Sequence, residues 1–102
     1  DADILLEDGE EVSFGGLNAK IIHTPGHTPG GISIKIGDNI FTGDTLFAGS
    51  IGRTDFPGGS YEEIISSIKD KIIIYPDNVI LYPGHGPATN VKLEKANNPF
   101  LR

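Results

Sequence analysis

Residues 32–47 read Ile-Ser-Ile-Lys-Ile-Gly-Asp-Asn-Ile-Phe-Thr-Gly-Asp-Thr-Leu-Phe. Isoleucine at every second position predicts a strand over residues 32–36 with one buried face, because successive side chains of a strand point to opposite sides of a sheet. Gly37-Asp38 predicts a turn into a second strand over residues 39–42, which Gly43-Asp44 ends. This part of the chain is therefore predicted to be two neighbouring strands followed by a loop that begins with a carboxylate.

The residues upstream continue the pattern of short strands. Ile4–Leu6 and Glu11–Phe14 lie on either side of Asp8-Gly9, a dipeptide typical of tight turns, and predict a small hairpin that Gly15-Gly16 ends. The alternation over residues 17–23 then predicts a further strand ending near His23.

The residues downstream add helices. Ser60 with Glu63 three residues later fits a capping box and predicts the start of a helix. One helical face then collects apolar side chains, which predicts that this face is buried: Tyr61, Ile64, Ile65, Ile68 and Ile72. Residues 78–82 predict a buried strand and residues 91–97 a last short helix. Strands with one or two helices place the chain in the α/β (α+β) class.

The composition excludes several kinds of protein. The chain has 102 residues, enough for one small domain, and its hydrophobic fraction of 37% is too high for a disordered tail. Fourteen acidic against eight basic residues argue against a nucleic-acid partner. The longest apolar run, at residues 72–75, is far short of a membrane span, so no membrane partner is expected. Asp1-Ala2-Asp3 does not resemble a signal peptide, and the lack of cysteine suits a cytoplasmic protein.

Three loops rich in glycine and proline each follow a predicted strand and carry a side chain able to bind a metal ion. These side chains are His27 in residues 24–31, Asp44 after the strand at 39–42, and His85 in residues 83–87. Imidazole and carboxylate are the usual zinc ligands when cysteine is absent. Taken singly, a loop histidine is more often a surface residue and Gly43-Asp44 more often a turn, so the residues alone leave a metal site and ordinary loops both open.

A second Gly-rich loop, residues 48–60, holds Arg53 and Asp55. Arg53 could hold a substrate carboxylate with Asp55 beside it in a cleft, or the two could form an ion pair that fixes the loop. His23 lies four residues before His27 and is assigned a structural, hydrogen-bonding role.

Three stretches together resemble successive signatures of the metallo-β-lactamase superfamily, in order and in rough separation. They are Thr24-Pro25-Gly26-His27-Thr28-Pro29-Gly30-Gly31, Phe41-Thr42-Gly43-Asp44-Thr45-Leu46-Phe47 and Tyr82-Pro83-Gly84-His85-Gly86. The subgroup that the chain resembles most is the glyoxalase II-like hydrolases, and Gly52–Phe56, the helix after Ser60 and Asn98-Pro99-Phe100 are similar too. The resemblance covers nearly the whole chain.

The resemblance implies a fold and a chemistry. The family fold is a four-layer αββα sandwich of two similar halves, and its site holds two metal ions, usually zinc, sometimes iron or manganese. Carried over to this sequence, His27 would bind the first metal, His85 the second, and Asp44, the catalytic carboxylate, would bridge both. A bridging hydroxide would then attack the carbonyl of a small-molecule thioester.

The family's first signature, His-x-His-x-Asp-His, has no counterpart in this sequence. Residues 1–102 are therefore expected to be the C-terminal half of the domain, a mixed sheet with helices on one face, and to bind metal weakly and hydrolyse little alone. Its partner would be the missing N-terminal half, or a second copy joined through the open sheet face, for which Ile32, Ile34 and Ile36 are candidates. Two other readings stay open: an iron-dependent persulfide dioxygenase, which Gly52–Phe56 also resembles, and a non-catalytic, self-assembling half-domain.

Overall fold

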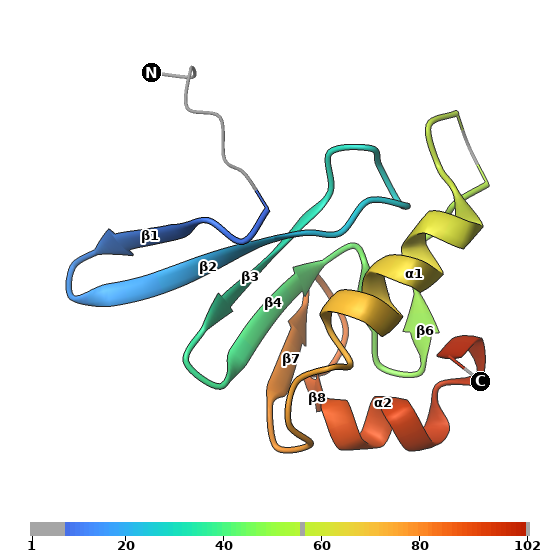
Figure 1. The fold of residues 1–102 in the computed structure, drawn as a ribbon. Coiled ribbons are helices and arrows are strands. Elements are labelled where there is room, and N and C mark those ends of the chain that lie inside the picture. Colours follow the sequence, from blue (N-terminus) through green and yellow to red (C-terminus); the bar gives the residue numbers. More distant parts are fainter. Residues whose placement is uncertain (1–7, 56, 102) are drawn as a thin grey trace.

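The computed structural model describes residues 8–55 and 57–101 and builds them around one mixed sheet of six strands (Figure 1). The order of strands in this sheet is β1-β2-β3-β4-β7-β8, and β5 and β6 form a separate two-stranded hairpin. The elements are β1 (Glu11–Phe14), β2 (Leu17–His23), β3 (Ile32–Ile36), β4 (Asn39–Gly43), β5 (Leu46–Phe47), β6 (Ser50–Ile51), α1 (Tyr61–Lys71), β7 (Ile80–Pro83), β8 (Thr89–Asn90), α2 (Val91–Asn97) and a 3-10 turn (Pro99–Leu101). The predicted α/β class is confirmed.

The first hairpin differs from the sequence prediction. Strand β1 pairs with β2 in antiparallel register, so the turn is formed by Gly15 and Gly16, with φ values of 54° and 82°. Only glycine adopts such angles readily, which is why this pair joins two strands where it was predicted to end a hairpin. The other predicted strand of that hairpin, Ile4–Leu6, lies outside the described residues.

The strand directions bring three loops to one edge of the sheet. Strand β3 runs antiparallel to both β2 and β4, and β4 runs parallel to β7. Strands β2, β4 and β7 therefore point the same way, and their carboxyl ends meet at the same edge (Figure 1). The loops that carry His27, Asp44 and His85 leave the sheet from these ends.

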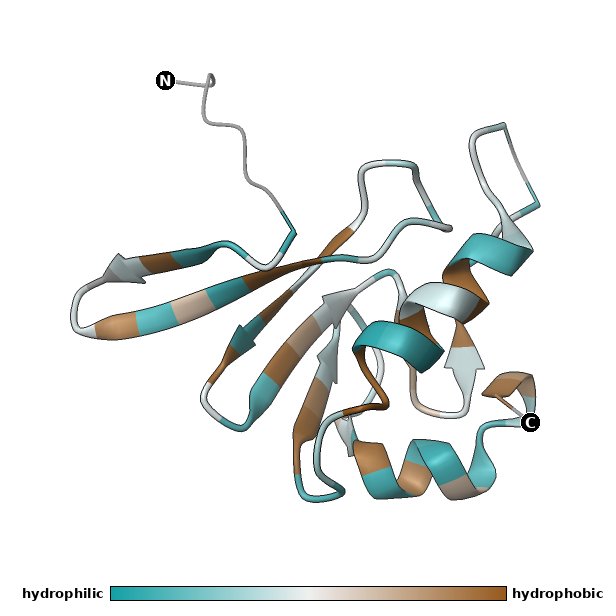
Figure 2. Ribbon diagram, in the orientation of Figure 1, coloured by the Kyte–Doolittle hydropathy of each residue, from teal (hydrophilic) through white to brown (hydrophobic). Residues whose placement is uncertain are grey.

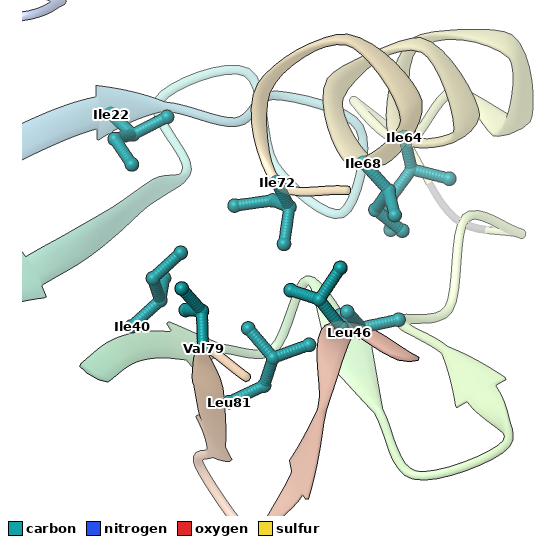
Figure 3. Packing of buried hydrophobic residues seen from close by; sticks show 9 residues of the cluster. Ile22, Ile40, Leu46, Ile64, Ile68, Ile72, Val79 and Leu81 are labelled. Atoms are coloured by element: carbon teal, nitrogen blue, oxygen red, sulfur yellow. The ribbon is translucent and has the colours of Figure 1, made fainter. Parts of the chain in front are cut away.

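Helix α1 closes the core over one face of the sheet. Ser60 is its N-cap and accepts a hydrogen bond from the amide of Glu63, as the capping box predicts. Figure 3 shows isoleucines of α1 pointing at residues from the strands and the β5 hairpin. The buried cluster comprises Ile22, Ile40, Leu46, Ile64, Ile68, Ile72, Val79, Leu81 and Val91. The prediction that Tyr61 joins this buried stripe is wrong: it is 52% exposed, because it stands in the first turn, before the helix reaches the core.

The isoleucines of β3 lie on the face turned away from the helices. Ser33 is fully buried on the helix side, whereas Ile32 is 39% exposed and Ile34 and Ile36 are half-buried. The strand thus has one buried face, as predicted, but in this chain the isoleucines lie on the other face, the one for which they were candidates in a half-domain. The register places Ile34 beside Phe41, which is 44% exposed. Apolar residues in β3, β4 and β7 are visible as brown bands in Figure 2.

We define the open face by the register of β2, β3, β4 and β7. Its members are Leu17, Ala19, Ile21, His23, Ile32, Ile34, Ile36, Asn39, Phe41, Ile80 and Tyr82. Ala19 and Ile21 are buried, so the exposed part of this face lies around Ile32, Phe41 and Ile80. None of these strand positions is Asp, Glu, Lys or Arg. The rings of Phe41 and Tyr82 stack at 5.2 Å across two strands of this face. Tyr82 thus packs on the open face and not within the helix-covered core.

Strand β6 lies within the loop predicted over residues 48–60, and β8 lies in a part of the chain for which the sequence gave no prediction. Strand β7 begins at Ile80, two residues later than predicted, and α2 has the predicted bounds. Among residues 8–55 and 57–101, no helix has the length and apolar character needed to cross a membrane.

Candidate functional site

The loops that leave the carboxyl ends of β2, β4 and β7 border one cleft of about 420 Å³. His27, Asp44 and His85 come from these three loops, and the β5–β6 hairpin with the residues after it forms a further wall. The lining residues are His27, Asp44, Phe47, Ser50, Ile51, Gly52, Arg53 and His85. The structure thus brings the three sequence-predicted ligands into one cleft, with Arg53 at its side.

His27 and Asp44 are the closest pair of candidate ligands. Nε2 of His27 lies 3.7 Å from Oδ2 of Asp44, and the Asp44 side chain is 55% exposed. Nδ1 of His27 lies 2.9 Å from the carbonyl oxygen of Arg53. Because a carbonyl only accepts hydrogen bonds, the proton of the neutral ring belongs on Nδ1, and the lone pair of Nε2 faces Asp44. A backbone carbonyl that orients an imidazole in this way is typical of metal-binding histidines.

Two glycines allow the loops to approach this closely. A Cβ added to Gly52 would lie 1.8 Å from the carbonyl oxygen of Asp44 and 3.3 Å from Cβ of His27. A Cβ on Gly84 would lie 3.3 Å from the backbone of Gly43, whose carbonyl accepts the Gly84 amide at 2.8 Å. The absence of side chains at these positions therefore sets the spacing between the loops.

Buried hydroxyl groups join the bases of the first two loops. Oγ1 of Thr24 lies 3.1 Å from Oγ of Ser33 and 3.2 Å from Oγ1 of Thr45. Thr24 and Ser33 are fully buried and Thr45 nearly so. Because a buried hydroxyl without a partner is costly, this network fixes the exit of the His27 loop against that of the Asp44 loop.

His85 lies on the other side of the cleft, on an exposed loop. Its ring packs edge-on against Phe47, with centroids 4.7 Å apart. A single zinc ion reaches nitrogen and oxygen ligands at about 2.0–2.2 Å, so it can touch two donors up to about 4.2 Å apart. The His27–Asp44 pair meets this limit, but within residues 8–55 and 57–101 no three His, Asp or Glu side chains form a group able to hold a metal ion. Imidazole and carboxylate are the right types of ligand for zinc, but the described residues offer fewer than the three that a catalytic zinc needs.

Arg53 and Asp55 form an ion pair. Nε of Arg53 donates to Oδ1 of Asp55 at 3.0 Å, and this bond is the main reason that the pKa of Asp55 falls below its ordinary value. Arg53 lines the cleft and Asp55 does not. The two side chains are 76% and 73% exposed, so both the loop-fixing role and the substrate-binding role stay predictions. His23 has the predicted structural role: its ring Nε2 lies 3.2 Å from the carbonyl oxygen of Pro29.

Sequence reasoning missed Phe47 and Gly52, which line the cleft, and the buried Glu94 of α2, which bonds the β5–β6 hairpin. Gly52 and Phe47 stand within quoted motifs, but nothing local shows that one meets His27 and the other His85. Glu94 lies far along the chain, and only the fold brings it to the β5–β6 hairpin.

The comparisons with known proteins agree with this geometry. The sequence profile of the metallo-beta-lactamase superfamily matches residues 1–85. This chain belongs to the metallo-beta-lactamase superfamily. Hydroxyacylglutathione hydrolase GloC of Haemophilus influenzae is 48% identical over 97 residues, which are 93% of this chain and 46% of that protein.

Solved structures of the superfamily share the fold. The crystal structure of ETHE1 from Myxococcus xanthus superposes with a TM-score of 0.91 at 37% identity over 96% of this chain and 45% of that one. TTHA1623, solved in a di-iron-bound form, superposes with a TM-score of 0.82 at 39% identity over 94% of this chain and 47% of that one. The chain spans about half the length of the relatives it matches. The predicted resemblance and fold are confirmed.

Proposed function

We propose that the intact parent of this chain is a metal-dependent hydrolase that cleaves small-molecule thioesters, as glyoxalase II-like enzymes do. The observation that carries the proposal is the convergence of His27, Asp44 and His85 on one cleft, with Nε2 of His27 3.7 Å from Oδ2 of Asp44. The relative GloC is named a hydroxyacylglutathione hydrolase, which supports a thioester as the substrate class.

Each residue of the cleft has a proposed task. Bound metal, zinc in the first place, would lower the pKa of a water molecule and polarise the substrate carbonyl. His27 would offer Nε2 to the first metal, since the Arg53 carbonyl accepts its Nδ1 proton, His85 would offer its imidazole to the second, and Asp44 would supply its carboxylate to both. The Arg53 guanidinium would hold a substrate carboxylate, with Asp55 orienting it; the position of Arg53 in the cleft wall and its bond to Asp55 support this role.

The donor set predicts how the isolated chain behaves. Because a catalytic zinc needs three protein ligands and this chain offers each metal two, zinc should bind weakly and leave on dialysis. Zinc titration followed by NMR should shift the ring signals of His27 and His85, and the Asp44→Ala variant, which lacks the ligand shared by both metals, should lose this response. His23→Ala is the matched control, since that ring bonds Pro29 and not the cleft. Near-stoichiometric zinc after dialysis, together with hydrolysis of a glutathione thioester by this chain alone, would contradict the expectation.

Two other functions remain as alternatives. An iron-dependent persulfide dioxygenase is supported by the Gly52–Phe56 motif, and metal analysis of the intact parent separates it from the hydrolase: one iron per site against two zincs. A non-catalytic half-domain would show no rise in melting temperature with zinc, whereas a working site stabilises the fold as ligand concentration exceeds Kd.

We propose further that a second polypeptide covers the open face: the other half in the intact parent and, in the isolated chain, a second copy. The uncharged, partly exposed surface around Phe41 and Ile80 supports this, because apolar surface patches often mark sites of protein–protein contact. The four strands, of four to seven residues each, span only about 19 Å across the sheet and about 13–23 Å along their length, so the association should be weak and depend on concentration.

Light scattering over a range of concentrations tests this association. Phe41→Glu should give a monomer, while Ile74→Glu, at a position 65% exposed outside the open face, should not change the association. A monodisperse monomer of the unmodified chain at high concentration would refute the second copy.

A further inference from the structure

Helix α2 carries a buried carboxylate that faces the hairpin of the candidate site. Glu94 is only 3% exposed. Its Oε1 accepts hydrogen bonds from the amide of Gly49 at 3.0 Å and from Nδ2 of Asn98 at 2.8 Å, and its Oε2 accepts from Oγ1 of Thr89 at 2.7 Å. Because a buried charge is costly without partners, three donors around one carboxylate make a specific and rigid arrangement.

Asn98, one helical turn after Glu94, completes this arrangement. It is fully buried, and its Nδ2 also donates to the carbonyl oxygen of Ser50 at 3.2 Å. Its Oδ1 accepts the amide of Phe100 at 2.9 Å, so the side chain cannot turn over without losing that bond. Glu94 and Asn98 thus hold an amide and a carbonyl of two consecutive residues, Gly49 and Ser50, in the β5–β6 hairpin.

The β5–β6 hairpin connects Glu94 and Asn98 to both histidines of the cleft. At its start, the Phe47 ring packs against the ring of His85. Just after its end, Gly52 lies against His27, and the Arg53 carbonyl accepts the Nδ1 proton of His27. A shift of the hairpin would therefore move the supports of His27 and His85 together.

We propose that Glu94 and Asn98 are positioning residues, which fix the β5–β6 hairpin from outside the cleft and through it the ring orientations of His27 and His85. Neither residue lines the cleft. Their value for catalysis rests on the proposed function, whereas the positioning itself is a property of the metal-free chain and is tested there.

The test compares Glu94→Gln with Glu62→Gln, which neutralises an exposed carboxylate on α1. Glu94→Gln keeps the size of the side chain and loses a charge-assisted acceptor, so exchange of the Gly49 amide proton should become about tenfold faster or more. The amide of Ile34, in β3 and away from the hairpin, reports global unfolding and should change less. Glu62→Gln should leave all of these rates as they are.

The histidine ring signals provide a readout that a general loss of stability would not move. In Glu94→Gln, the ring protons of His85 should shift as its contact with Phe47 loosens, and the ring nitrogens of His27 should lose the clear Nδ1–H pattern. Thr89→Val removes one hydrogen-bond donor to Glu94 and should cause the same changes in exchange rate and ring signals, but smaller ones. It is the variant to use if Glu94→Gln does not fold. Equal acceleration at Gly49 and Ile34 with unchanged ring signals, or no acceleration at Gly49, would overturn the proposal. Failure of zinc binding would bear only on the proposed function.

Discussion

Substituting alanine for Gly52 should separate the loops of the cleft. The added Cβ would lie 1.8 Å from the carbonyl oxygen of Asp44, and ordinary contact begins at 3.4 Å, so one of the two must move by about 1.6 Å. Movement of Gly52 strains its own hydrogen bond, because its amide donates to the carbonyl of Thr45 at 3.0 Å. Overpacking costs about 1–3 kcal/mol and a lost hydrogen bond about 1 kcal/mol more. We expect Gly52→Ala to lower the free energy of unfolding by about 2–4 kcal/mol.

The assay is denaturant unfolding, with NMR shifts of Asp44 and His27 as the local readout. Gly30→Ala is the matched control, since no atom lies within 4 Å of the added Cβ and neither glycine has a positive φ. This control should be neutral or slightly stabilising, because alanine restricts the unfolded chain. If Gly52→Ala is as stable as Gly30→Ala and leaves the two site residues unshifted, the argument that Gly52 sets the loop spacing is wrong.

Three further variants test other parts of the structure. Thr24→Val leaves the buried hydroxyls around it short of a partner and should cost about 1–3 kcal/mol in denaturant unfolding. Ser60→Ala removes the cap of α1 and should cost about 1 kcal/mol, with reduced helicity by circular dichroism. The pKa of Asp8 lies below its ordinary value of 3.8. The main cause is the hydrogen bond that its carboxylate accepts from the His23 amide, and the second is the hydrogen bond from the Lys71 ammonium. Its stabilisation, below about 1 kcal/mol for so exposed a group, is fully present above pH 3.8 and is lost as the pH falls through the lower folded-state pKa. Asp8→Asn should therefore destabilise at pH 7 and lose this effect once the pH lies below the folded-state pKa.

The sequence predicted the elements whose signals are local. The strands at 32–36 and 39–42, the capped helix after Ser60 and the short helix at 91–97 all occur, because alternation and capping depend on neighbours along the chain. The same local signals could not tell which side of β3 faces the helices. Ser33 is buried and Ile34 is not, since the face that the helices cover depends on the whole sheet.

The candidate site shows the same division. Three motifs predicted His27, Asp44 and His85 as ligands, and the shared direction of β2, β4 and β7 brings their loops into one cleft. No motif indicated that Gly52 would touch His27 or that Phe47 would support His85, because these contacts join residues more than twenty positions apart.

The sequence by itself determined the family, the class of fold and the types of side chain available for a metal. It also determined that the His-x-His-x-Asp-His signature is absent from these 102 residues. Only the tertiary structure decided how closely His27 and Asp44 approach, which sheet face stays uncovered, and that a carboxylate at position 94 holds the hairpin at Gly49. The physical reason is that residue types are fixed by the sequence. Distances and burial are fixed only when strands distant in sequence pair and the helices pack on one face of the sheet.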